Sequence, residues 1–121
     1  MQTFKSNGGT ATGYLASPRA SSGPGVLVIQ EWWGLIDQVK RIADMFAGEG
    51  FNAFAPDFYH GKSAQIGEPD AAQKLMMELD LDRATKDARG AAQYLAAHPK
   101  TSSQKIGVIG FCMGGMLALM A

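Results

Sequence analysis

The sequence contains one cysteine, and it lies between two glycines. Cys112 is the central residue of Gly110-Phe111-Cys112-Met113-Gly114, which follows the apolar residues 105–109 and precedes a second apolar run, 115–121. A glycine two residues before and two residues after a nucleophile, between a buried strand and a helix, is typical of a nucleophile elbow. The sequence therefore predicts that Cys112 is a nucleophile at the carboxyl edge of a sheet.

This position also indicates how the thiol would be activated. A helix N-terminus carries partial positive charge that would stabilise the thiolate, and the backbone N–H of Met113 would point to where a tetrahedral oxyanion forms. A buried structural thiol is the alternative, because free cysteines are common in protein cores. A phosphate-binding or dinucleotide-binding loop fits less well, because the glycines match neither G-x-G-x-x-G nor G-x-x-x-x-G-K-[ST].

A second group of candidate residues is Gln30-Glu31-Trp32-Trp33, which begins at the last residue of the strand expected at 25–30. An α/β-hydrolase places at this point the loop that donates the other oxyanion-hole N–H, and the backbone of Trp32 is the candidate donor. Glu31 would lie beside Cys112 if the two strands are parallel neighbours, and otherwise it is a solvated loop charge. Trp33 is a candidate for the substrate wall or a packing residue.

Alternating strands and helices must position these residues. We expect a helix over 37–47 with Asp37 as its N-cap, and a helical region over 69–97 with a break near Asp80. Strands are expected at 12–17, 25–30, 51–56 and 105–109. This order predicts an α/β fold, a mostly parallel sheet flanked by helices, within one domain.

Composition limits the partners. The 121 residues include 11 basic and 11 acidic side chains, so the net charge is zero and nothing indicates nucleic-acid binding. No apolar run approaches the roughly 20 residues that span a bilayer, and one cysteine suits a reducing compartment. We expect a cytoplasmic protein that binds a small molecule, with no cofactor, no metal ion, and no nucleic-acid or membrane partner.

Three ordered motifs resemble the dienelactone hydrolase family. That family carries Q-E or H-E, then P-D-[LF]-[YF], then G-[FY]-C-x-G-G, and the middle motif corresponds here to Pro56-Asp57-Phe58-Tyr59. The resemblance implies an ester or lactone hydrolase that forms an acyl-enzyme thioester with a Cys, Asp and His triad. It also implies that Cys112 is the nucleophile, Glu31 its buried carboxylate partner, and Trp32 and Met113 the oxyanion-hole amides.

The sequence departs from the family pattern in the substrate-binding segment and in the triad. The family's substrate-carboxylate arginine follows the P-D motif, whereas here the segment continues Tyr59-His60-Gly61-Lys62, so Lys62 would serve as a point charge. We expect Trp33, Tyr59, His60 and Lys62 to line the substrate pocket.

The family's triad acid and base come well after the elbow, yet only the residues up to Ala121 follow Cys112. We therefore expect residues 1–121 to be the N-terminal half of an α/β-hydrolase, completed by a missing C-terminal half, a complementing chain or self-association. His60 and His98 are weak substitutes for the base, and Asp57 is expected to fix its own loop. Two alternatives remain open: an interaction module that has lost catalysis, and a thiol redox sensor.

Overall fold

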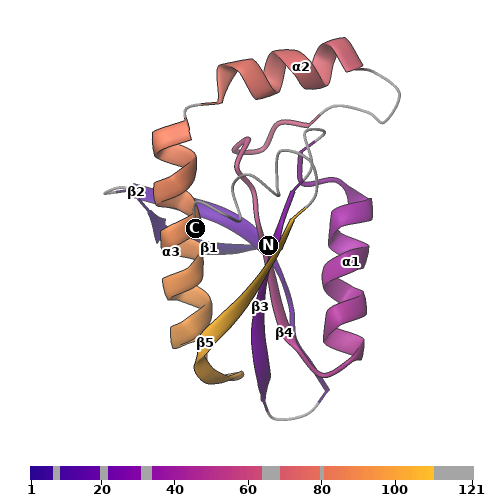
Figure 1. Cartoon of the computed structure of the whole chain (residues 1–121), viewed down its shortest axis with the longest axis vertical. Helices are drawn as coiled ribbons and strands as arrows, with labels where there is room; N and C mark the ends of the chain where they lie inside the picture. The colour runs from indigo at the N-terminus through magenta and orange to yellow at the C-terminus, as the bar shows by residue number, and fades with distance from the viewer. Residues whose placement is uncertain (7–8, 20–21, 31–33, 64–68, 80, 111–121) are drawn as a thin grey trace.

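Five strands form one sheet that lies between helices on its two faces (Figure 1). The computed structural model describes residues 1–6, 9–19, 22–30, 34–63, 69–79 and 81–110. The strands are β1 (Gln2–Ser6), β2 (Gly9–Ala16), β3 (Gly23–Ile29), β4 (Asn52–Pro56) and β5 (Thr101–Gly110). The helices are α1 (Asp37–Gly48), α2 (Pro69–Glu78) and α3 (Leu81–Ala97). None of the described helices is both long enough and apolar enough to cross a membrane.

The sheet is mixed, with strand order β1-β2-β4-β3-β5. β3 pairs in parallel with both β4 and β5, whereas β1 pairs antiparallel with β2, and β2 antiparallel with β4. The predicted α/β architecture with flanking helices is therefore confirmed. The expectation of a mostly parallel sheet holds for the β4-β3-β5 part. The strand expected at 12–17 is present as β2, whereas β1 and the antiparallel pairings of β2 were not predicted.

β3 and β4 are apolar on both sides because each face of the sheet is covered at these strands. In β3, Leu27 and Ile29 belong to the core on the α3 side, and Val26 and Val28 to the core on the α1 side. β4 follows the same alternation, with the fully buried Phe54 on the α3 side. This two-sided burial explains the continuous apolar runs by which these strands were predicted.

Helix α1 covers one face, and its apolar stripe has the predicted spacing. Val39 and Ala43 are buried, and Ile42 and Phe46 pack against the same core. The prediction of Asp37 as N-cap is wrong. Asp37 is the first helical residue, and the cap is Ile36, which has an extended backbone and makes no side-chain cap hydrogen bond. Asp37 can still interact favourably with the positive end of the helix dipole from the first turn.

The long helical region does break near residue 80, as predicted, into α2 and α3. Helix α3 covers the second face, and the side chains that it buries there are mostly small: Ala84, Ala88, Ala91 and Leu95. The helix crosses β1 at Gly90, where a Cβ atom would lie 2.5 Å from the carbonyl oxygen of Lys5. The small residues therefore let α3 approach the sheet closely.

Candidate active site

The carboxyl ends of β3 and β5 lie side by side, because Ile29 is the register partner of Gly110. The chain leaves β3 toward Glu31 and leaves β5 toward Cys112, so the two predicted motifs start from adjacent parallel strands. Glu31, Trp32, Trp33, Cys112 and Met113 themselves lie outside the described residues. Their placement stays a prediction, as does the helix expected after the elbow.

Residues 57–62, which follow β4 at the same edge of the sheet, are called the site loop here. The buried carboxylate of Asp57 accepts hydrogen bonds from two backbone amides of this loop, Tyr59 N at 3.1 Å and Gly61 N at 2.6 Å. Gly61 has φ of 91°, which a glycine adopts without strain. The prediction that Asp57 fixes its own loop is confirmed.

The side chain of Gln30 connects the site loop to the end of β3 by a hydrogen bond. This side chain is fully buried, and its Oε1 accepts a hydrogen bond from the backbone N–H of Phe58 at 2.9 Å. Its Nε2 is buried and has no hydrogen-bond partner among the described residues. An unpaired buried amide donor costs about 1–3 kcal/mol. Gln30 immediately precedes Glu31 in the chain, so this contact joins the two candidate segments of the site.

His60 is held by a carboxylate that the sequence analysis did not identify. Its Nε2 lies 2.9 Å from Oδ2 of Asp87, a buried residue of α3, and its side chain is 29% exposed. The other carboxylate oxygen of Asp87 accepts a hydrogen bond from the hydroxyl of Ser6 in β1. His60 has φ of 52°, a left-handed conformation that costs a side-chain-bearing residue about 1–2 kcal/mol.

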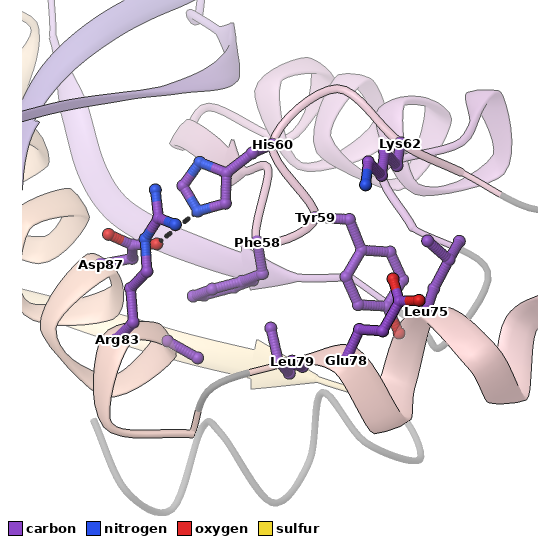
Figure 2. Close-up of a pocket in the computed structure, with 10 residues that line it drawn as sticks. Phe58, Tyr59, His60, Lys62, Leu75, Glu78, Leu79, Arg83 and Asp87 are labelled. Atoms are coloured by element: carbon purple, nitrogen blue, oxygen red, sulfur yellow. Dashed lines mark hydrogen bonds and ion pairs between the residues drawn. The ribbon is translucent and has the colours of Figure 1, made fainter.

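A pocket of about 230 Å³ opens between the site loop and the two helices that follow it (Figure 2). It brings together three predicted substrate-lining residues, Tyr59, His60 and Lys62. The remaining lining residues come from the rest of the loop, α2 with the residue after it, and α3: Phe58, Leu75, Glu78, Leu79, Arg83, Ala84 and Asp87. Cationic, anionic and apolar side chains thus share this pocket, so it can contact both the polar and the apolar parts of a small molecule.

Tyr59 is 6% exposed, and this burial raises the pKa of its hydroxyl from 10.0 to about 12. The hydroxyl therefore stays protonated and neutral far above physiological pH. It can act as a hydrogen-bond donor, but not as a base, at neutral pH.

His98 lies away from the site loop. It follows α3, and its Nδ1 accepts a hydrogen bond from the backbone N–H of Lys100 and lies 3.3 Å from Nδ2 of Asn52, the first residue of β4. This is the amino end of β4, whereas the site loop follows its carboxyl end. The structure therefore places His98 at the end of β4 opposite the site loop. In the described part of the chain, no group of three or more histidine, cysteine or acidic residues could hold a metal ion.

Comparison with curated proteins gives relatives over most of the chain. Protein usf of Aquifex pyrophilus is 47% identical over 125 residues, and the match covers 98% of this chain and 53% of that protein. Carboxymethylenebutenolidase 1 of Cupriavidus pinatubonensis is 29% identical, with 93% of this chain and 50% of that protein covered. The chain spans about half the length of the curated relatives that it matches.

Solved structures and a family model agree with these relatives. The putative dienelactone hydrolase of Klebsiella pneumoniae superposes with a TM-score of 0.80 at 26% identity, covering 94% of this chain and 49% of that chain. The described fold thus corresponds to half of an α/β-hydrolase. The model of the dienelactone hydrolase family matches residues 11–121. Because this match includes nearly the whole sequence, the chain belongs to the dienelactone hydrolase family.

Proposed function

We propose that the protein encoded by the complete reading frame hydrolyses carboxylic esters or lactones through Cys112. The observation that carries the proposal is the parallel register of β3 and β5, in which Ile29 pairs with Gly110. In the sequence, Glu31 follows Ile29 by two residues and Cys112 follows Gly110 by two residues, so a carboxylate and a thiol would meet at one edge of the sheet. Family membership supports the same chemistry, because the relative from Cupriavidus pinatubonensis is named a carboxymethylenebutenolidase.

In the proposed reaction, the Cys112 sulfur attacks the acyl carbon of the ester, and the bond to the leaving oxygen breaks. The alcohol leaves with a proton and a thioester remains, which water then hydrolyses to the carboxylic acid and the free thiol. The backbone amides of Trp32 and Met113 would stabilise both tetrahedral intermediates, and Glu31 would stand beside the thiol. The triad acid and base would come from residues outside the 121, either later in the same chain or in a complementing one.

The pocket supports a small organic substrate. Tyr59, His60 and Lys62 line it, and we propose that Trp33 completes the substrate wall and that Lys62 attracts a negatively charged substituent. The single thiol would stay reduced in the cytoplasm, where we place the protein. Residues 1–121 would then form one domain that is incomplete by itself.

The test is turnover of activated aryl esters by the complete protein and by its Cys112→Ala variant. The proposal requires that the variant loses turnover by several orders of magnitude, and that alkylation of the wild-type thiol has the same effect. Met45→Ala, on an exposed position of α1, is the matched control and should keep wild-type activity. Turnover that survives in Cys112→Ala would contradict the proposal, and a complete protein without any turnover would favour an interaction module.

A further inference from the structure

We propose that Asp87 is a positioning residue that acts through His60, so that substrate binding in the pocket depends on a carboxylate of α3. This inference rests on the proposed function, because the site loop matters for activity only if its pocket receives the substrate. Neither Asp87 nor α3 belongs to the motifs that identify the family in this sequence. The backbone conformation of the site loop and the burial of Asp87 indicate this role.

The site loop contains a strained backbone conformation at His60. His60 is the one non-glycine residue with positive φ among the residues described here. Backbone strain of this kind persists only where surrounding contacts stabilise it, and it occurs preferentially at functional sites. The contact at the His60 side chain is the hydrogen bond of Nε2 to Asp87, and Figure 2 shows the ring and the carboxylate facing each other at one side of the pocket.

Asp87 is suited to hold a histidine ring in one orientation. It is 3% exposed, and each of its two oxygens accepts a hydrogen bond, one from His60 and one from Ser6 of β1. A carboxylate that is desolvated and bonded on both oxygens cannot rotate without breaking a contact. Because the Asp87 carboxylate accepts a hydrogen bond from Nε2 of His60, it stabilises the tautomer of neutral His60 that carries the proton on Nε2.

The other contacts of the loop act on its backbone and not on this ring. Asp57 bonds the amides of Tyr59 and Gly61, and Gln30 bonds the amide of Phe58. Without Asp87 the turn would remain, whereas the His60 ring would lose its orientation on the pocket wall. The expected loss is therefore in substrate binding, with the chemical step at Cys112 little affected.

The test is the Asp87→Leu variant of the complete protein, which keeps a side chain of similar size but removes both acceptor oxygens. We expect KM for an aryl ester to rise by roughly threefold to tenfold, with kcat within roughly twofold of wild type. Ser6→Ala is the matched control, because it removes the other hydrogen bond of the same carboxylate. KM should rise less in this control than in the Asp87 variant, because the bond between Asp87 and His60 remains, even if both variants unfold at a lower temperature.

Two results would overturn the inference: an unchanged KM in folded Asp87→Leu, or an equal rise of KM in Ser6→Ala, which would indicate a general structural role. ¹⁵N NMR of the His60 ring in the wild-type protein provides a readout that needs neither activity nor a variant. It should show the proton of the neutral ring on Nε2, and a proton on Nδ1 would also overturn the inference. Absence of all ester turnover would instead contradict the proposed function while leaving this NMR result interpretable.

Discussion

Gln30 and Asn52 are both fully buried amides, and the structure predicts different costs for replacing them. Gln30 donates to no described residue, whereas Asn52 uses both ends of its amide, with Oδ1 accepting from Ser17 and Nδ2 contacting Thr101 and His98. We predict that Gln30→Met leaves the free energy of unfolding within about 1 kcal/mol of wild type. Asn52→Leu should lower it by about 2–4 kcal/mol.

The difference follows from which penalties each substitution adds and removes. Methionine at position 30 leaves the Phe58 N–H without its acceptor, which costs about 1–3 kcal/mol. The same substitution removes Nε2, which is buried and has no partner in the part of the chain that the structure describes, and this penalty is of similar size and opposite sign. Leucine at position 52 removes three polar contacts and relieves no unpaired group, so nothing offsets the loss.

Urea unfolding of the complete protein, followed by tryptophan fluorescence, measures both free energies, provided that the dependence on urea is unchanged by the substitutions. Hydrogen exchange of the Phe58 amide provides a second readout and should be faster in Gln30→Met. If Gln30→Met costs more than about 3 kcal/mol, Nε2 has a partner in the folded protein and the reasoning about Gln30 is wrong. An unchanged free energy of unfolding in Asn52→Leu would also contradict this reasoning, because the variant loses three polar contacts.

Three further predictions concern single side chains. Because the pKa of Tyr59 is about 12 in the folded protein and 10.0 in the unfolded chain, the unfolded chain loses the proton first. The stability linked to Tyr59 is thus present below pH 10.0 and is lost as the pH rises to about 12, by about 3 kcal/mol. Tyr59→Phe should lack this part of the alkaline loss in urea unfolding at rising pH, and an unchanged pH profile would contradict the assignment. Phe54→Ala should lower the free energy of unfolding by about 3–5 kcal/mol, because Phe54 is fully buried between Phe4 and Tyr94; a loss below about 1 kcal/mol would place it outside the core. Asp57→Ala should speed hydrogen exchange at the amides of residues 59 and 61 and raise KM, and unchanged exchange would show that the turn holds without the carboxylate.

The core of the fold could be predicted because its signals are local. Two patterns were identified from the sequence: the apolar run from Val26 to Ile29 and the helical spacing of Val39 and Ala43. Each pattern lies within one element and reflects only which of its faces are buried. β1 was missed because only Phe4 of its residues is a large apolar side chain. Phe4 is nevertheless buried by its edge-on contact with Phe54, a residue of a different strand.

The site was predictable only where it depends on neighbours in the chain. Asp57 bonds residues two and four positions ahead, so a loop-fixing role could be inferred from a P-D motif followed by glycine. The contacts of Gln30 with Phe58 and of His60 with Asp87 join residues 28 and 27 positions apart. No spacing rule within one element links such residues, because the first contact requires that β4 pairs with β3, and the second requires that α3 packs on the sheet beside the site loop.

The most direct test of the central claim is to identify the covalent intermediate. The complete protein is mixed with an activated aryl ester, quenched in acid during turnover, and analysed by mass spectrometry of the intact protein and of its peptides. We predict a mass increase equal to one acyl group, located on the peptide that contains Cys112, removable by hydroxylamine, and absent from Cys112→Ala. Turnover without any acyl group on Cys112, or an acyl group on another residue that persists in Cys112→Ala, would contradict the account.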